Sequence, residues 1–302
     1  MIENKQFEIS IIIPTYNRPN ALKRAVRSVI RQCYKNWQLI VVNDGDDMGL
    51  PDFFLELNDE RVVYSKNKRT KGGNGARNTG ALLAKSDYIA FLDDDDEWHK
   101  EKLSIQVKHL AEMKLADCSI IGFSYVSRDF DCETKEGKIK PYKLKRKINL
   151  KNVLLGRVGL CASSTILIRK SFFVNIGMFD EHLRRHQDLE FMLRVLSKTD
   201  VHFCDKNLVF IHGHNEPSFD KLEIYKKQYW DLAQSYLMGF DEKTVKQFYA
   251  NEYRSLAIYA ARDGIYSKLW TYLKEAVRRD FSPSRENLRL FYYIAKFLVI
   301  NK

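Results

Sequence analysis

Four consecutive aspartates, Asp93 to Asp96, are the feature of this sequence with the clearest chemical consequence. They follow residues 88–92 (YIAFL), an apolar run that is typical of a buried strand. Four carboxylates delivered to one place repel one another, and a divalent cation relieves that repulsion. Hard oxygen ligands suit Mg²⁺ or Mn²⁺, so we predict a metal site here. If the strand continued, Asp93 and Asp95 would share one face and Asp94 and Asp96 the other, so only part of the run could bind one metal.

Two further aspartates stand where chemistry or local structure could use them. Asp44 follows the apolar run at residues 38–42 and precedes Gly45. It is either a turn former or an acceptor for a nucleobase N–H or a ribose hydroxyl. Asp188 begins an amphipathic segment, where it is either a helix cap or a general base held on a rigid element.

Glycines and histidines supply two weaker signals. Residues 72–80 (GGNGARNTG) open a predicted helix, and flexible glycines there would allow the backbone to approach a phosphate closely. Arg77 either faces a diphosphate or is an ordinary solvated residue of the helix. His212 and His214 are two apart, so they lie on one face of an extended segment. They are either structural or in contact with a metal or phosphate.

The first hundred residues predict the elements that position these groups. Strands are expected at residues 9–13, 38–42, 61–64 and 88–92, with one helix after Pro19 and another that opens with residues 72–80 and ends before Asp87. This alternation indicates a mostly parallel sheet with helices on both faces. Ligands of such sheets bind beyond the carboxyl ends of the strands. Thr15, Asn17, Asp44 and the aspartate run all lie at those ends, so one site could collect them.

The rest of the chain continues the α/β pattern and then becomes helical. We expect strands at 118–126 and 163–168, a helix at 187–198, and two short strands at 201–204 and 208–211. From about residue 221 the pattern is helical, rich in Tyr, Phe and Leu. The predicted domains are therefore residues 1–218, which carry the chemistry, and 219–302, a helical accessory region.

Composition limits the class of protein and its surroundings. The 302 residues carry a formal net charge of +11, which favours anionic partners. Five cysteines without a CxxC pair indicate reduced, packed thiols. The sequence contains neither a signal-like segment nor an apolar run of about 20 residues, so we expect a cytoplasmic protein, with any membrane contact peripheral. The Lys-rich stretch 135–151, interpreted as a mobile loop, and the amphipathic segment 288–302 could supply that contact. The segment could instead pack on the protein or on a second copy in a homodimer.

Four motifs taken together resemble the family 2 glycosyltransferases, which have the GT-A fold. They are residues 11–19 (IIIPTYNRP), 41–47 (VVNDGDD), 72–98 (GGNGARNTGALLAKSDYIAFLDDDDEW) and 177–194 (GMFDEHLRRHQDLEFMLR). The resemblance covers residues 8 to about 215. It implies transfer of a sugar, with inversion, from a nucleotide diphosphate donor that is often uridine-based. The acceptor would be a glycan or lipid-linked hydroxyl, as in bacterial surface polysaccharide synthesis, and no nucleic acid would be involved.

The resemblance also implies roles for individual residues. Pro14, Thr15, Asn17 and Asp44 would hold the nucleoside. Asp93 or Asp94 would touch the ribose, and Arg77 is the candidate for the diphosphate. Asp95, with Asp96 and His212 as further candidates, would hold Mn²⁺ or Mg²⁺, and Asp188 would be the base. The sequence departs from the family in having Gln187 before the base instead of Glu, and four Asp residues obscure the position of the DXD motif.

Other classes fit less well. A dinucleotide-dependent oxidoreductase would need GxGxxG directly after the first strand, where the sequence reads PTYNRP. A nucleotidyltransferase should carry a Gly-rich phosphate loop at the same place, and a P-loop NTPase needs GKS or GKT, which the sequence lacks. A non-catalytic module of the same fold, binding a nucleotide-sugar or a membrane, is the remaining alternative. A turnover assay would distinguish it.

Overall fold

The computed structural model describes residues 7–114, 116–127, 137–160, 162–213 and 217–280. Contacts divide the chain into two compact units. The sheet unit comprises Met1–Asn149 and Leu160–His214, and the helical unit comprises Leu150–Gly159 and Asn215–Lys302. All the residues proposed for chemistry from the sequence, His214 apart, are described in the sheet unit.

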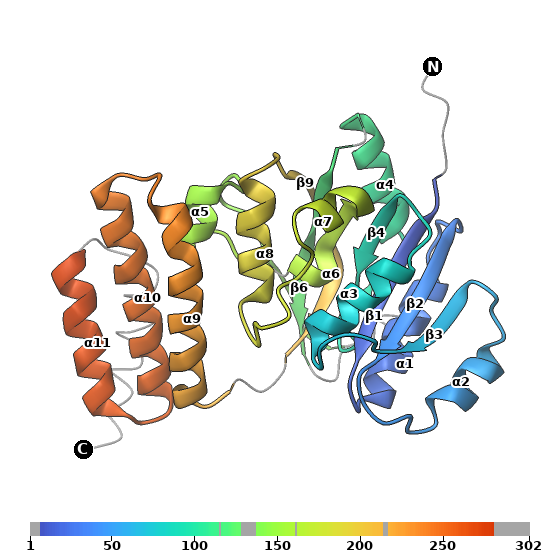
Figure 1. The fold of residues 1–302 in the computed structure, drawn as a ribbon, viewed down its shortest axis with the longest axis horizontal. Coiled ribbons are helices and arrows are strands. Elements are labelled where there is room, and N and C mark those ends of the chain that lie inside the picture. The colour runs from blue at the N-terminus through green and yellow to red at the C-terminus, as the bar shows by residue number, and fades with distance from the viewer. Residues whose placement is uncertain (1–6, 115, 128–136, 161, 214–216, 281–302) are drawn as a thin grey trace. The chain divides into compact units, whose positions relative to one another are not determined.

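The first half of the sheet is parallel, as the alternating pattern predicted. Its strands are β1 (Ile9–Thr15), β2 (Trp37–Asn43), β3 (Val62–Lys66) and β4 (Tyr88–Phe91), in the order β3-β2-β1-β4 (Figure 1). Every residue of β1 and β4 is buried, which explains their continuous apolar sequence. Thr15 and Asn43 end neighbouring strands in register, so the polar residues that follow them emerge at one edge.

The second half of the sheet mixes directions. Its strands are β5 (Glu97–Trp98), β6 (Cys118–Val126), β7 (Ile139–Pro141), β8 (Ile166–Arg169) and β9 (His202–His212). β8 runs antiparallel between β4 and β6, β6 and β9 are parallel, and the short β5 and β7 pair antiparallel to β9 and β6. Within the described residues nine strands form one sheet. The expected parallel arrangement therefore holds for the first four strands and gives way to a mixed one beyond β4.

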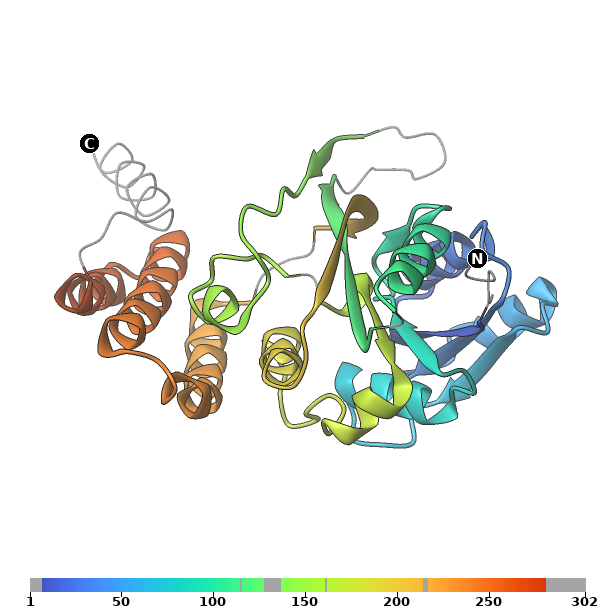
Figure 2. The same cartoon turned by 90° about the horizontal axis from the view of Figure 1, so that it is seen from above.

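Helices cover both faces of this sheet. They are α1 (Pro19–Ile30), α2 (Leu50–Leu57), α3 (Gly73–Leu83), α4 (Lys102–Glu112), α6 (Ala162–Thr165), α7 (Lys170–Asn175) and α8 (Gln187–Leu196). In two perpendicular views α1 and α4 lie on one face, and α3, α6 and α7 on the other (Figures 1 and 2). A Cβ at Gly80 would lie 2.4 Å from Ile12 Cγ2, so only glycine lets α3 approach β1 this closely.

Two sequence predictions in this unit were wrong in detail. The predicted strand at 163–168 begins only at Ile166, because residues 162–165 form the short helix α6. The two short strands predicted at 201–204 and 208–211 are one strand, β9, interrupted by a bulge. From Ile121 to Phe123 the partner residue advances from Cys204 to Val209, so β9 carries extra residues opposite Gly122.

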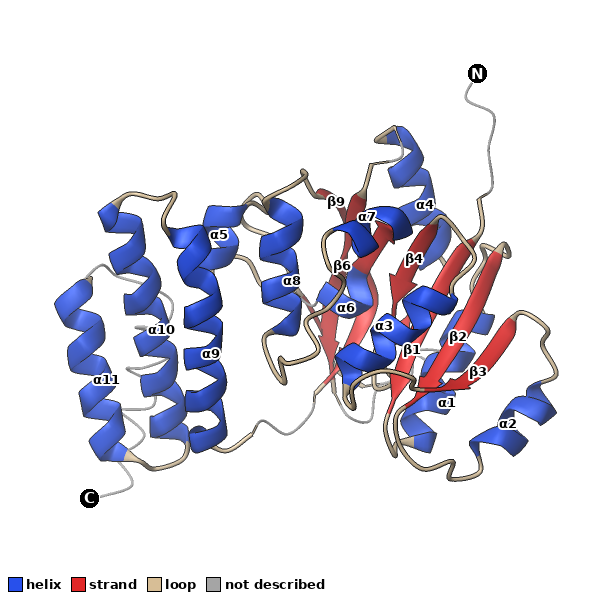
Figure 3. Cartoon of the chain, in the orientation of Figure 1, coloured by secondary structure: helices blue, strands red, loops and turns tan. Residues whose placement is uncertain are grey.

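The helical unit contains α5 (Leu150–Leu154), α9 (Phe219–Leu237), α10 (Glu242–Arg262) and α11 (Tyr266–Arg279), drawn as helices in Figure 3. The Asp241 carboxylate caps α10 by accepting from the Thr244 N–H at 2.7 Å. No helix among the described residues is long and apolar enough to cross a membrane. The amphipathic segment 288–302 lies outside the described residues. In the described part of the basic stretch, residues 137–151, β7 and the start of α5 flank residues 142–149, which have no regular structure.

Candidate active site

The aspartate run forms a turn after β4 and does not continue the strand. The Asp96 N–H donates to the Asp93 carbonyl at 3.0 Å. Asp93 and Asp95 are partly exposed and Asp94 and Asp96 are buried, so exposure alternates as expected. The contacts do not follow that alternation, because the turn brings Asp94 together with Asp95, and Asp93 together with Asp96.

Asp94 and Asp95 share one guanidinium, that of Arg18. Arg18 Nη2 lies 2.9 Å from Asp94 Oδ1, and Nη1 lies 2.5 Å from Asp95 Oδ2. Thr15 Oγ1, at the end of β1, donates to the other Asp94 oxygen at 2.8 Å. The ends of β1 and β4 are thus joined through Asp94, and the predicted site residues Thr15, Asp94 and Asp95 lie together.

Asp93 and Asp96 are held by two adjacent serines of α6. Ser163 Oγ donates to Asp93 Oδ2 at 2.7 Å, and Ser164 Oγ donates to Asp96 Oδ2 at 2.6 Å. Arg77 Nη2 donates to the second Asp93 oxygen at 2.5 Å. Arg77 is buried over the Phe179 ring, so the structure places it against Asp93 within the protein. Its predicted contact with a diphosphate stays a prediction.

The pKa values of these carboxyl groups differ because their partners differ. Burial raises the pKa of Asp94 to about 6 despite Arg18 and Thr15. Burial and then the charges of Asp93 and Asp95 raise the pKa of Asp96 well above its usual value. Burial acts in the same direction at Asp93, but Arg77 and Ser163 bring its pKa below the usual value. The protein therefore compensates the ionised forms of Asp94 and Asp96 only in part.

Asp188 lies in the first turn of α8, and its carboxyl group interacts electrostatically with Asp93 of the cluster. Its Oδ1 accepts from the Leu189 N–H at 3.1 Å, an interaction at the helix start. Burial, followed by the charge of Asp93, raises its pKa, and Arg77 acts in the opposite direction. A raised pKa is what a carboxylate needs to accept a proton from a hydroxyl.

Hydrogen bonds tie α3 to the segment that leads into α8. Asn78 exchanges hydrogen bonds with the backbone of Phe179, at 2.8 and 3.0 Å. Asn74 Nδ2 donates to the carbonyls of Asp180 and Leu183, at 2.6 and 3.0 Å. Glu181 accepts from Asn78, Arg69 and Thr70, and these bonds lower its pKa to about 2 although burial opposes them. The segment before Asp188 is therefore fixed against the same helix that carries Arg77.

Asp44 organises the loop that precedes α3. Its carboxylate accepts from Asn67 Nδ2 at 2.6 Å and from the Gly72 N–H at 2.7 Å. Asn17, at a positive φ of 52°, accepts from the Asp46 N–H at 2.8 Å and donates to the Asp46 carboxylate. Pro14 is buried near the end of β1. These residues lie at the predicted edge of the sheet, and their contacts with a nucleoside stay predictions.

His212 lies against an acid that the sequence analysis did not single out. Its Nε2 is 2.9 Å from Glu97 Oε1, and both side chains are buried. Among the described residues no group of three His, Cys, Asp or Glu side chains is arranged to hold a metal. Mg²⁺ is usually bound by one or two carboxylates plus substrate phosphates, so the Asp94–Asp95 pair fits a cation that completes its shell from a diphosphate. The assignments of Asp95, Asp96 and His212 to a metal and of Asp93 or Asp94 to the ribose stay predictions, and His214 lies outside the described residues.

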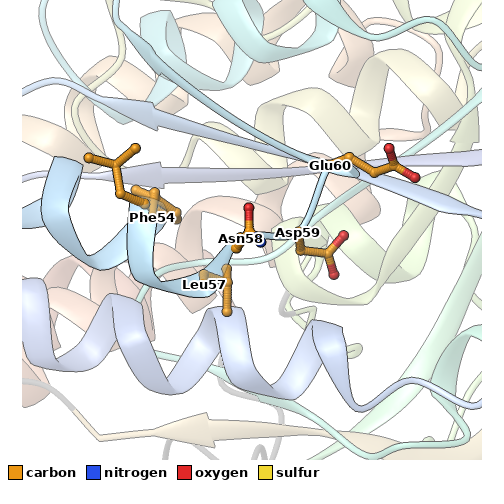
Figure 4. A pocket seen from close by; sticks show the side chains of 6 residues that line it. Phe54, Leu57, Asn58, Asp59 and Glu60 are labelled. Carbon is orange, nitrogen blue, oxygen red and sulfur yellow. The ribbon is translucent and has the colours of Figure 1, made fainter.

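A hollow elsewhere in the sheet unit is lined by Phe54, Leu55, Leu57, Asn58, Asp59 and Glu60 (Figure 4). It lies where α2 ends and leads toward β3, and none of the predicted site residues lines it. We therefore do not assign it to the reaction.

Sequence reasoning missed three groups that the structure brings to the site. Arg18 was available as the polar residue between Asn17 and Pro19, in a segment that the analysis used for Asn17. Ser163 and Ser164 were assigned to a strand, which gave their hydroxyls no role. Asn74 and Asn78 are one helical turn apart on α3, a spacing that places two amides on one face.

Comparison with known proteins gives the family. Residues 10–177 match the model of Glycosyl transferase family 2, which is more than half of the chain. The chain belongs to this family. It is 32% identical over 166 residues to UDP-Glc:alpha-D-GlcNAc-diphosphoundecaprenol beta-1,3-glucosyltransferase WfgD of Escherichia coli, covering 54% of this chain and 63% of that protein. It is also 32% identical over 201 residues to the amylovoran biosynthesis glycosyltransferase AmsB of Erwinia amylovora, covering 63% and 64%.

The fold agrees with a solved member of the glycosyltransferase class. TarS residues 1–349 of S. aureus, in complex with UDP-GlcNAc, superpose with a TM-score of 0.65 and 18% identity, covering 96% of this chain and 88% of that one. The predicted GT-A architecture with C-terminal helices is thereby confirmed. The chain spans about two fifths of the length of the uncharacterized glycosyltransferases of Rickettsia species that it matches.

Proposed function

We propose that the chain is an inverting, metal-dependent glycosyltransferase that moves a sugar from a UDP-sugar to a hydroxyl of a glycan or lipid-linked glycan. The observation that carries the proposal is the aspartate turn beside Thr15, with Asp188 within electrostatic reach of Asp93. A family fold alone would not specify a reaction. A cluster of carboxylates with too few cationic partners, next to a carboxyl group of raised pKa, supports a catalytic role for the site.

The proposed reaction is a single displacement. The acceptor oxygen forms a bond to the anomeric carbon as the bond from that carbon to the diphosphate breaks. The acceptor proton passes to the Asp188 carboxylate, and attack opposite the leaving group gives inversion. The hydrogen bonds from Asn74 and Asn78 to the segment before α8 would hold this base in place.

Asp95, with Asp94 beside it, is the residue we propose to hold Mn²⁺ or Mg²⁺. Bound there, the cation would neutralise charge that develops on the leaving diphosphate. Thr15, Asn17 and Asp44 lie at the same sheet edge and are proposed to hold the nucleoside.

The proposed acceptor follows the names of the relatives. WfgD is named for a diphosphoundecaprenol-linked acceptor and AmsB for polysaccharide biosynthesis. A lipid-linked acceptor would bring a cytoplasmic enzyme to the membrane face. Lys143, Lys145, Arg146 and Lys147 are exposed and could attract anionic headgroups.

The test is a screen of nucleotide-sugars for thermal stabilisation and for Mn²⁺-dependent turnover, followed by chelation. We expect UDP-sugars to be turned over, turnover to stop in chelator, and Asp95→Ala to abolish it. Asp59→Ala, in the hollow that we do not assign to the reaction, is the control and should retain activity. Full activity in chelator would refute metal dependence, and nucleotide-sugar binding without turnover would favour the non-catalytic module.

A further inference from the structure

Arg18 lies beside the proposed cation site and has no role in the proposed reaction. It precedes Pro19 at the start of α1, with φ −129° and ψ 60°, and its side chain reaches across to the turn after β4. The two ends of its guanidinium contact two different carboxylates, Asp94 and Asp95. A planar guanidinium suits such a two-point contact better than a point charge does.

The charges around the turn make this contact significant. Asp93 has Arg77 and Ser163, and Asp96 has Ser164. Asp94 and Asp95 each form an ion pair with Arg18. Asp94 is 2% exposed whereas Arg18 is 52% exposed, so the arginine can leave toward solvent without opening the core.

We propose that Arg18 occupies the cation position of the donor-free protein and competes with the divalent ion for Asp94 and Asp95. This rests on the proposed function, in which Asp95 holds the metal. Arg18 and the divalent ion offer positive charge to the same oxygens, so both cannot contact them fully at once. The diphosphate supplies additional metal ligands and an anionic partner for the released guanidinium. The cation therefore enters together with the nucleotide, and free protein binds it weakly.

This role makes Arg18 a positioning residue, and it is tested without turnover. Free Mn²⁺ is measured by electron paramagnetic resonance while the whole protein is titrated, with and without UDP. Wild-type protein should bind Mn²⁺ at least tenfold more tightly with UDP than without it. Arg18→Gln should bind Mn²⁺ about tenfold more tightly than wild type in the absence of UDP, because the competing charge is gone.

Two further variants separate local competition from a change in net charge. Arg27→Gln removes the same charge from an exposed position of the same helix and should bind Mn²⁺ as wild type does. Arg18→Lys keeps the positive charge but loses the planar guanidinium. Its affinity for Mn²⁺ without UDP should lie between those of wild type and Arg18→Gln. Circular dichroism checks that each variant is folded.

The outcomes are distinct. Equal Mn²⁺ affinity of wild type and Arg18→Gln without UDP overturns the competition while leaving the proposed metal site intact. A gain as large in Arg27→Gln also overturns it, because the effect would then be one of net charge. If neither protein binds Mn²⁺ even with UDP, the metal-dependent function fails, and the inference fails with it.

Discussion

The helical unit and the aspartate turn both enclose acidic groups, but they neutralise them differently. In the helical unit, Glu252 is buried against Lys226, with Nζ to Oε2 at 2.9 Å, and accepts from Trp230 Nε1 at the same distance. In the aspartate turn, four carboxylates contact only Arg18 and Arg77 among the ion pairs described above. In the helical unit, Glu252 has its own cationic partner and Glu223 has two, whereas the four carboxylates of the turn outnumber their two arginines.

The pKa values express this difference. Burial acts to raise the pKa of Glu223 in α9, but hydrogen bonds from Lys227, Tyr272 and Lys268 bring it to about 2. Burial raises the pKa of Asp94 to about 6, and the opposing effects of Arg18, which Asp94 shares with Asp95, and of Thr15 do not offset it. A protein gains nothing in stability from an uncompensated buried carboxylate. The excess at the turn is therefore better explained by a ligand than by the fold.

Breaking the matched pair should have the largest effect. Glu252→Ala leaves the Lys226 ammonium buried without its partner, which should destabilise the helical unit by about 3–5 kcal/mol. Hydrogen exchange of α9 and α10 would measure it. The double variant Lys226→Met with Glu252→Gln is the control and should recover most of the loss, because it leaves no buried charge and keeps an acceptor for Trp230 Nε1. A small loss of unfolding free energy in Glu252→Ala would mean that the Lys226–Glu252 ion pair does not stabilise the helical unit.

At the turn, the largest effect should be on rate and not on stability. Asp188→Asn keeps the size of the side chain and removes its ability to take a proton, so kcat should fall about 10²-fold or more. Steady-state kinetics would measure kcat, and the thermal midpoint should stay close to wild type. Asp200→Asn, an aspartate outside the site, is the control. Transfer near the wild-type rate would reduce Asp188 to a helix cap.

Glu223, which accepts hydrogen bonds from Lys227, Tyr272 and Lys268, should make the stability of the helical unit depend on pH. Its pKa is lowered by folding, so its stabilisation is complete above about pH 4.5, the ordinary value, and is lost as pH falls toward 2. Between about pH 4.5 and 3 the wild-type helical unit should lose about 1–2 kcal/mol more than Glu223→Gln does. Hydrogen exchange of α9 to α11 across this range is the measurement. Parallel pH dependence of the two proteins would contradict it.

The smallest effect concerns Asp44, which accepts hydrogen bonds from the loop before α3 and is also proposed to hold the nucleoside. Asp44→Ala should raise the donor KM about tenfold, more than it lowers kcat, if the carboxylate reads the nucleoside. Asn67→Ala loosens the same loop while leaving the carboxylate in place, and it should change KM less. Equal effects of the two variants would assign Asp44 to loop structure alone.

The common position of the proposed site residues could be predicted from the strand ends. β1, β2 and β4 end within two residues of the ends of their predicted apolar runs, so Thr15, Asp44 and the aspartate run lie at one edge of the sheet. The sequence could not show which aspartates of the run lie together. Alternation of side chains between two faces applies to a strand, whereas Asp93–Asp96 form a turn. The serines were missed for a related reason, since the short segment SST before an apolar run reads equally well as strand. The partner of His212 depends on the pairing of β5 with β9, which no local pattern specifies.

The bulge of β9 opposite Gly122 has a consequence for tolerance to insertion and deletion. Successive residues of a strand point to opposite faces, so the bulge sets which face each residue beyond it presents. His212 lies beyond it and meets Glu97 on the face that the bulge selects. Deleting Asp205 or Lys206 should shift every later residue of β9 by one position. Val209 and His212 would then each point to the face of the sheet opposite the one they occupy now. The length of this short segment is thus as constrained as the identity of the histidine, although its own side chains are solvent-exposed.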